Sequence, residues 1–344
     1  MGQAAADRMS QPMKQRIRRS FAIGTAFWCA SVMAESPAPV VCGAPPHISR
    51  SIVLNDYYVD SAKSIVDPAR KQAYEDAVKP MRKAAGAVDE LADRYRSAHD
   101  VAAAQCAASW LEDYARHGAL LDMRAGNEAV YVQGWIGGSL AIAWLKVRDA
   151  ELPPHQRAQI AGWLATLAER NVAYYRSRPP GAKDARNNLR YWAGLTALAS
   201  GLAAGRRDLV DWGIGSFRIG VDQIAADGTL PLEMRRKSLA LHYHLFAAAP
   251  LVTIAELAEI NGVSLYGYRD GALGRLVERA LSGIEDSSFF ADRAGTVQKP
   301  DQLRAEDVVW ASPFLHRFPN PRLNAILERF PSGTMLYIGG RPLG

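Results

Sequence analysis

Apolar residues recur at spacings of three and four along most of this chain, whereas runs that alternate with a period of two are scarce. The first pattern places apolar side chains on one face of an α-helix, and the second is typical of a half-buried β-strand. The pattern therefore predicts an almost entirely helical protein without a sizeable sheet. The expected helices are 68–95, 100–121, 129–147, 153–174, 187–204, 208–223, 235–261, 271–282 and 305–317.

Turn-forming residues separate these helices, as at Pro179-Pro180-Gly181, Asp227-Gly228 and Asn261-Gly262. Because most connections are short, successive helices are expected to be antiparallel neighbours. Stretches of small residues, such as 193–204, allow helices to approach closely. No fixed repeat and no change of composition divides the helical part. We therefore predict a single all-α domain over residues 35–344, a toroid of antiparallel helical hairpins.

Residues 1–34 have the features of a secretory signal peptide. A basic stretch, 14–19, precedes an apolar run, 21–30, and Val32-Met33-Ala34 forms a small-residue cleavage site. The apolar run is too short to span a bilayer, although an uncleaved anchor stays open as the alternative. We expect export to the periplasm, without stable membrane insertion after cleavage.

The net charge of +6 suggests an anionic partner, but most of this charge lies in the expected signal peptide, residues 1–34. Residues 1–34 hold five basic residues and one acidic residue, and the rest of the chain holds 36 basic and 34 acidic residues. A nucleic-acid partner therefore loses its main support. The length of 344 residues and the 49% of hydrophobic residues allow a substantial core. We expect a monomer.

The cysteines agree with export. Cys29 lies within the leader, so Cys42 and Cys106 are the pair that remains in the mature chain. A disulfide between them is permitted in an oxidising compartment and would tie the Pro-rich entry segment to the helix around Trp110. Two unpaired, buried thiols are the alternative.

Residues 228–250 are predicted to form a turn followed by one amphipathic helix. Arg236 and Tyr243 are seven positions, or two helical turns, apart and would project from the same face. A neighbouring guanidinium favours the phenolate and lowers the pKa of a phenol, which can then act as a base. Upstream, Asn188 and Arg190 supply a carboxamide and a second cation that suit a substrate carboxylate. The pattern indicates lyase chemistry on an acidic sugar.

Several stretches, in the same order along the chain, resemble the alginate lyases of polysaccharide lyase family 5, periplasmic enzymes that cleave polymannuronate. They are the Cys42 segment, Asp60-Ser61-Ala62-Lys63-Ser64, Cys106 with Trp110-Leu111, Asn187-Asn188 with Tyr191-Trp192, Arg206-Arg207-Asp208-Leu209 with Asp211-Trp212, and Leu230-Pro231 through Glu233, Arg236, Tyr243 and His244. The resemblance runs from about Cys42 to about Phe290. It implies an incomplete (α/α) toroid, or barrel, with a deep cleft.

The resemblance also implies a catalytic set of Asn188, Arg236 and Tyr243. The family's catalytic histidine position holds Leu189, and a second family tyrosine is replaced by Phe246. β-Elimination requires neutralisation of the uronate carboxylate and stabilisation of the enolate that develops. Leucine can do neither, and loss of one acid–base group costs roughly 10²–10⁴ in rate.

Five further residues are candidates for substrate binding: Arg190, Trp192, His242, His244 and Tyr58. Arg190, His242 and His244 are also the candidates to compensate for Leu189. Neighbours of Tyr243 on a helix point about 100° away from it, so packed histidines remain the alternative for His242 and His244. Tyr58 belongs to segment 55–64, which is a candidate lid over the cleft or else an exposed loop without a role.

Other chemistries find little support. No metal-ligand spacing or cofactor motif stands out, and Gly213-Ile214-Gly215 lies within a predicted helix rather than in a phosphate-binding loop. Glu233 is expected to orient Arg236 or to cap the helix, and a glycosidase with paired carboxylates is a weaker alternative. We predict an exported polysaccharide lyase that cleaves a polyuronate, either polymannuronate or a glucuronate-containing polymer, by β-elimination without metal or cofactor. The rival is a polyuronate-binding protein with little or no turnover, acting in exopolysaccharide export or periplasmic clearance.

Overall fold

The computed structural model describes residues 39–123, 126–299, 303–330 and 333–343. The expected signal peptide, 1–34, lies outside them. The chain divides into two units at residues 39 and 40, and all elements below belong to the second unit. They are β1 (Ser51–Ile52), α1 (Pro68–Ala98), α2 (Val101–His117), β2 (Asp122–Met123), α3 (Asn127–Val147), α4 (Pro154–Arg176), η1 (Lys183–Ala185), α5 (Asn188–Ala204), α6 (Arg207–Val221), α7 (Pro231–Met234), η2 (Lys237–Leu239), α8 (Ala240–Ile260), α9 (Tyr268–Glu285), α10 (Ser288–Ala294), η3 (Ala305–Asp307), η4 (Val309–Ala311), α11 (Ser312–Arg317), α12 (Pro321–Glu328) and η5 (Leu336–Ile338).

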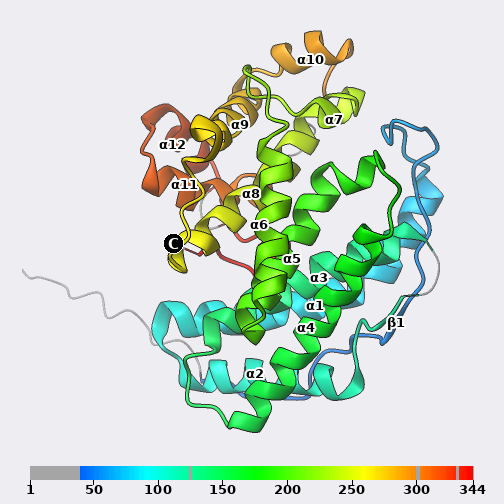
Figure 1. The fold of residues 1–344 in the computed structure, drawn as a ribbon. Coiled ribbons are helices and arrows are strands. Elements are labelled where there is room, and N and C mark those ends of the chain that lie inside the picture. Colours follow the sequence, from blue (N-terminus) through cyan, green and yellow to red (C-terminus); the bar gives the residue numbers. More distant parts are fainter. Residues whose placement is uncertain (1–38, 124–125, 300–302, 331–332, 344) are drawn as a thin grey trace, which may run out of the picture. The chain divides into compact units, whose positions relative to one another are not determined.

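Successive helices from α1 to α6 lie side by side, as do α8 and α9 (Figure 1). Helix α5 packs against α3, α4, α6 and α8, while α1 packs against α2 and α3. Among the described residues, the strands form a single parallel pair, with Ser51 opposite Asp122 and Ile52 opposite Met123. The all-α prediction without a sizeable sheet is therefore confirmed.

Small residues allow the close approach of α5 and α6 that the sequence predicts. A Cβ atom on Gly194 would lie 2.4 Å from Cβ of Ser216, and one on Gly213 would lie 2.7 Å from the carbonyl oxygen of Gly194. Both glycines therefore leave room for the opposite backbone. This close packing fixes α5, whose first residues line the cleft described below.

Helix α8 is apolar on all sides and lies in the core, against α5, α6 and α9. The stretch Lys237–Ile260 is long and apolar enough to cross a membrane, but 78% of its most apolar window is buried inside the protein. A helix that is apolar all round is expected in the core of a large domain. The burial of α8 is explained by packing alone.

The predicted starts of α1 and α2 are accurate because a capping residue precedes each helix. Asp67 accepts a hydrogen bond from the backbone of Arg70 at the start of α1, and Asp100 accepts one from Ala103 at the start of α2. Gly118 then ends α2 at His117, because its φ of 61° leaves the helical region. The predicted helix 100–121 is therefore too long at its end.

The predicted helix 235–261 is wrong in its first turn. Pro231 begins the four-residue helix α7, and Lys237, with a φ of 53°, lies in the short 3₁₀ turn η2 before α8 starts at Ala240. The predicted helix 305–317 is likewise divided into η3, η4 and α11, and α7, α10 and α12 were not predicted. The local propensity of these short segments is too weak to place them without their tertiary contacts.

The predicted disulfide is present. Cys42 and Cys106 are bonded, with their Cα atoms 5.4 Å apart, so the entry segment is tied to α2 as expected. Two side chains of α2 hold the same segment, since Trp110 donates to the carbonyl oxygen of Gly43 at 2.9 Å and Tyr114 donates to that of Pro46 at 2.8 Å. The segment that leads into the candidate lid is therefore anchored.

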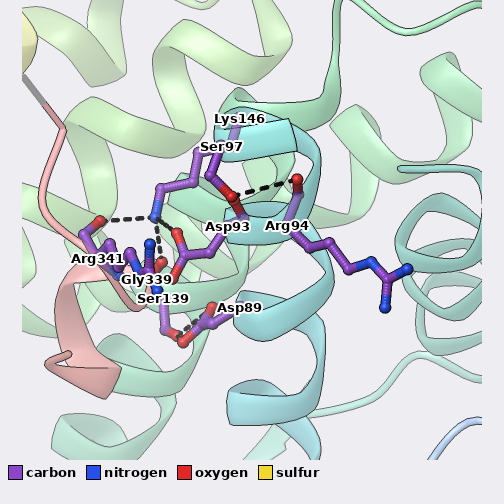
Figure 2. A network of polar contacts seen from close by, with 8 residues as sticks. All are labelled: Asp89, Asp93, Arg94, Ser97, Ser139, Lys146, Gly339 and Arg341. Carbon is purple, nitrogen blue, oxygen red and sulfur yellow. Dashed lines mark hydrogen bonds and ion pairs between the residues drawn. The ribbon is translucent and has the colours of Figure 1, made fainter. Parts of the chain in front are cut away.

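A buried ion pair attaches the segment 335–341 to α1 and α3 (Figure 2). Nζ of Lys146 donates to a carboxylate oxygen of Asp93 and to the carbonyl oxygens of Gly339 and Arg341, the latter two at 2.6 and 2.7 Å. The backbone N–H of Arg341 donates to the other oxygen of Asp93 at 2.8 Å. All three ammonium donors are used, which offsets the cost of burying the charge.

We predict that Lys146→Ala strongly destabilises the protein. The substitution leaves the Asp93 carboxylate buried without its cation, which typically costs about 3–5 kcal/mol. The free energy of unfolding from a denaturant titration measures the loss. The control is Lys79→Ala, which removes an exposed lysine of α1 and is expected to stay within about 0.5 kcal/mol of the wild type. Equal stability of the two variants would contradict the assignment.

Candidate active site

A deep cleft of about 1240 Å³ contains most of the residues that the sequence singles out. Its walls come from the segment 54–66, α1, the start of α3, η1, the start of α5, residues 232–246, and the segments 304–307 and 335–337. Asn188, Arg236 and Tyr243 all line it, as do Tyr58, Leu189 and His242. The fold thus brings together residues that are far apart in the sequence.

Arg236 and Tyr243 are in contact, although they are not on one helix. Arg236 precedes η2 and Tyr243 lies in the first turn of α8, yet the guanidinium carbon is 3.4 Å from the centre of the phenol ring. The cation lies over the face of the ring, which is the geometry of a cation–π contact. The predicted juxtaposition is correct, but its predicted origin on one helical face is wrong.

The pKa of Tyr243 is raised well above its ordinary value, not lowered as the sequence argument expects. Burial is the largest cause, and the neighbouring Tyr58 raises the pKa further, whereas Arg236 lowers it. The guanidinium therefore opposes the effect of burial without overcoming it. At a pH below this raised pKa, Tyr243 is a neutral phenol.

Tyr58 reaches the same phenol from segment 55–64. The two hydroxyl oxygens of Tyr58 and Tyr243 are 2.6 Å apart, a hydrogen bond in which either can donate. Tyr58 also pairs through its backbone with Val66 in an isolated antiparallel bridge, which closes the intervening residues into a compact loop. This loop therefore places a hydroxyl against the reactive group.

Arg236 also holds that loop. Its Nη2 donates to the carbonyl oxygen of Lys63 at 2.7 Å. Asp60 shapes the loop from inside, because its carboxylate accepts from the backbone N–H groups of Ser64 and Ile65 at 2.8 and 2.7 Å. These bonds hold the pKa of Asp60 near 2, even though burial acts in the opposite direction. One guanidinium thus contacts both Tyr243 and the backbone of the candidate lid.

A buried carboxylate fixes Asn188. Oε1 of Glu233 accepts from the backbone N–H of Asn188 at 2.8 Å, and Oε2 accepts from its side-chain Nδ2 at 2.9 Å. Glu233 is completely buried, which raises its pKa although Asn188 and Arg236 act to lower it. It caps α5 across 45 residues of sequence, a favourable position because negative charge stabilises a helix N-terminus. The expectation that Glu233 caps a helix is met at α5 rather than at α8.

Leu189 lies at the cleft wall directly after Asn188. Its side chain packs with the buried Tyr131, Tyr175 and Ala193. Its backbone N–H donates to the side chain of Asn187 at 3.1 Å, and its carbonyl oxygen accepts from the hydroxyl of Tyr175 at 3.0 Å. Leucine is well packed here, and it adds an apolar surface next to the polar cluster.

Arg190 and Trp192 lie outside the cleft lining, so the expectation that they contact substrate is not supported by their positions. The guanidinium carbon of Arg190 is 3.7 Å from the centre of a Trp212 ring, and Nε donates to Ser216 at 2.9 Å. Residues two apart on a helix point about 200° away from each other, so Arg190 faces away from Asn188. Trp192 is 1% exposed and packs against Phe246 and Tyr337 beneath the cleft surface.

The two histidines beside Tyr243 have different roles. His244 is fully buried, with Nε2 accepting from the backbone of Leu230 at 2.9 Å and Nδ1 next to the carbonyl oxygen of Ala240 at 2.7 Å. Burial lowers its pKa to about 4. His244 is therefore a packed histidine, and the substrate-binding alternative fails. His242 does line the cleft, stacked on Phe246. Loss of contact with water lowers its pKa, and nearby cations such as Arg236 lower it further.

Arg82 and Asp184 line the cleft but were not singled out from the sequence. Arg82 of α1 donates to the hydroxyl of Tyr337 at 2.9 Å and pairs with Glu75. In a second group, Asp184 accepts from the hydroxyls of Tyr131 and Tyr174 at 3.0 and 2.7 Å. The spacing of Glu75 and Arg82 on one helix was a usable signal, whereas nothing in the sequence near Tyr337 indicates where it packs.

Two buried polar atoms in the cleft wall have no partner among the described residues. They are Nε of Arg236 and Oδ1 of Asn188. A buried polar atom that lacks a hydrogen bond typically costs about 1–3 kcal/mol. Such atoms are tolerated where a ligand can satisfy them, and both belong to residues next to Tyr243 or Glu233. The arrangement suits a ligand with carboxylate and hydroxyl groups.

Comparison with other sequences gives a consistent result. A family model described as Alginate lyase matches residues 52–290. A polysaccharide lyase of Stenotrophomonas maltophilia is 41% identical over 275 residues, which cover 79% of this chain and 82% of that protein. An alginate lyase of Azotobacter vinelandii is 32% identical over 269 residues, covering 76% of this chain and 70% of the other. One of Pseudomonas aeruginosa is 30% identical over 298 residues, covering 83% and 80%.

Solved structures agree on the fold. Alginate lyase A1-III from Sphingomonas species A1 matches with a TM-score of 0.72 at 24% identity, over 87% of this chain and 84% of the other. A histidine-to-alanine variant of alginate lyase A1-III complexed with tetrasaccharide matches with a TM-score of 0.76 at 23% identity, over 88% and 86%. The predicted (α/α) toroid is thereby confirmed.

We predict that Glu233→Ala destabilises the protein because it removes the acceptor for two buried donors of Asn188. Each donor left without a partner is expected to cost about 1–3 kcal/mol. Glu233→Gln retains an oxygen for the backbone N–H and should lose less. Denaturant titration of both variants measures the free energies of unfolding. An alanine variant as stable as the glutamine variant would show that the carboxylate does not anchor α5.

Proposed function

Because this chain belongs to the alginate lyase family, we propose that its cleft cleaves a polyuronate by β-elimination. The family consists of polysaccharide lyases, and the relatives described above are named as such. The observation that carries the proposal is the contact of Arg236 with the ring of Tyr243, beside an asparagine fixed by a buried carboxylate. The substrate is polymannuronate or a glucuronate-containing polymer.

In this proposal Arg236 and Asn188 neutralise the substrate carboxylate. Nε of Arg236 has no partner among the described residues, and Nδ2 of Asn188 has a second proton after its bond to Glu233. Hydrogen bonds from these groups draw charge away from the carboxylate, which acidifies the proton at C5 and stabilises the enolate. Glu233 contributes by holding the amide of Asn188 in place.

Tyr243 transfers the proton. As phenolate it takes the C5 proton, the C5–H electron pair forms the C4–C5 double bond, and the C4–O4 bond breaks. The phenol then gives the proton to the departing O4, which restores the phenolate. Removal of the hydroxyl thus removes both the base and the acid. The hydrogen bond with Tyr58 keeps the hydroxyl oriented while the cleft is empty.

The cleft must work without the family's histidine, and the geometry leaves one candidate to replace part of its role. Arg190 is turned onto Trp212, and both nitrogens of His244 are engaged within the core. His242 remains, exposed to the cleft and adjacent to Tyr243. We assign it a substrate contact, in which its neutral ring donates or accepts a hydrogen bond.

Segment 55–64 is proposed as a lid. Tyr58 and Lys63 line the cleft, and Arg236 holds the backbone of Lys63. When a substrate carboxylate engages Arg236, the guanidinium binds the lid and the substrate together. Such a contact couples closure of the lid to occupation of the site.

The working compartment is proposed to be the periplasm. The disulfide between Cys42 and Cys106 is typical of proteins outside the reducing cytosol. The leader-like sequence of residues 1–34 favours export across the inner membrane.

We predict that Tyr243→Phe reduces turnover by at least about 10²-fold, the lower range for an acid–base group, while polymer binding persists. Elimination creates a 4,5-unsaturated uronate, so the rise of ultraviolet absorbance on polymannuronate and polyglucuronate measures the rate. Tyr268→Phe is the matched control, because Tyr268 lies outside the cleft lining and its hydroxyl contacts Asp222 at 3.2 Å. Wild-type activity in the Tyr243 variant would refute its assigned role.

The pH profile tests the protonation state of Tyr243. Its pKa is raised, so the phenolate fraction below that pKa grows about tenfold with each pH unit. We expect kcat/KM to increase with pH through the neutral and mildly alkaline range, as far as the protein stays folded. A plateau that begins below the ordinary histidine pKa would instead identify His242, whose pKa is lowered, as the base.

A further inference from the structure

A second, smaller groove of about 390 Å³ adjoins the cleft. It is lined by Gly181, Lys183, Arg186, Gln223, Pro231, Leu232 and Arg235. Three of these residues, Lys183, Leu232 and Arg235, also line the cleft, so the two depressions share a wall. The groove thus begins beside the turn that carries Arg236 and leads away over η1 and the start of α7.

The charge of the groove differs from that of the cleft. Its lining contains three cations, Lys183, Arg186 and Arg235, and no carboxylate. The cleft lining mixes basic residues with acidic ones such as Glu75, Glu128 and Asp184. A groove lined by one sign of charge attracts a polymer of the opposite sign.

The side chains of the three cations are exposed to solvent. No ion pair joins any of them to an acidic group of the described residues. The backbone beneath Arg186 is held in place, because its carbonyl oxygen accepts from the hydroxyl of Tyr191 at 3.0 Å and from Nε2 of Gln223 at 2.7 Å. The charges are therefore available to a ligand, while the backbone of Arg186 is anchored to Tyr191 of α5 and to Gln223, which follows α6.

We propose that this groove is an extension of the substrate site that binds uronate units of a long polymer beyond those in the cleft. The inference rests on the proposed function, since it requires an anionic chain in the cleft that continues past Leu232. Each uronate unit carries one carboxylate, which an exposed arginine or lysine recognises by charge and hydrogen bonding. The groove therefore selects for chain length and not for the chemistry of the bond that is cleaved.

Arg186 provides the test, because it lines the groove and not the cleft. We compare wild type and Arg186→Glu on purified uronate oligomers, from trimers to long polymer, by ultraviolet absorbance. Charge reversal is expected to raise KM for the long polymer about 3- to 10-fold, the range of one or two exposed charge contacts. Turnover at saturation, and KM for the trimer, should not change. Added salt should reduce the difference, because exposed charges are screened.

The matched control is Lys79→Glu, which makes the same change of charge on the exposed surface of α1, outside both linings. The proposal is overturned if Lys79→Glu raises KM for the polymer as much as Arg186→Glu does. It is also overturned if Arg186→Glu affects the trimer and the polymer equally.

Failure of the proposed function would be recognised separately. Wild-type protein that turns over none of the oligomers refutes the lyase proposal but leaves the groove testable. Equilibrium binding of trimer and polymer is then measured in a Tyr243→Phe background, with and without Arg186→Glu. A length-dependent loss of affinity that is confined to Arg186→Glu supports the groove, and its absence refutes it.

Discussion

The bond between the buried carboxylate of Glu233 and Asn188 is the constraint on which the site depends. It joins the turn at α7 to the first residue of α5, two segments that no local pattern would bring together. Burial of a carboxylate is costly, and here the cost is offset by two hydrogen bonds and by the positive end of a helix. Arg236 lies three positions after Glu233 in the chain. The bond between Glu233 and Asn188 therefore also sets where the guanidinium enters the cleft.

Arg236 then links the site to the loop above it. Its guanidinium lies over the ring of Tyr243, and one nitrogen holds the backbone of Lys63, while Nε has no partner in the part of the chain that the structure describes. A lysine could provide the charge, but it could not stack on a ring and donate in several directions of one plane. The geometry explains why this position needs a guanidinium and not merely a cation.

Much of the fold was predictable from the sequence, because long periodic helices and their caps are local signals. The helix 235–261 was drawn too long since apolar periodicity continues through a turn that Pro231 and Lys237 impose. The contact of Arg236 with Tyr243 was still anticipated, because seven positions along the chain keep the two residues close whether they share one helix or are separated by a turn. The orientation of Arg190 was available from helical geometry alone, given its position two residues after Asn188. The anchoring of Asn188 by Glu233 and the packing of Tyr337 against Arg82 depend on contacts between distant segments, which leave no local pattern.

The attachment of segment 335–341 has a consequence for how the cleft is acquired during folding. Lys146 and Gly339, which are 193 residues apart, meet in one buried network, and Tyr337 of that segment forms part of the cleft wall. Contacts between such distant residues require closure of a very long loop, so they lower the rate of folding more than local helix pairing does. The helical hairpins can form early, whereas the complete wall of the cleft has to wait for this pairing. Binding competence is thus expected among the last properties that the folding chain gains.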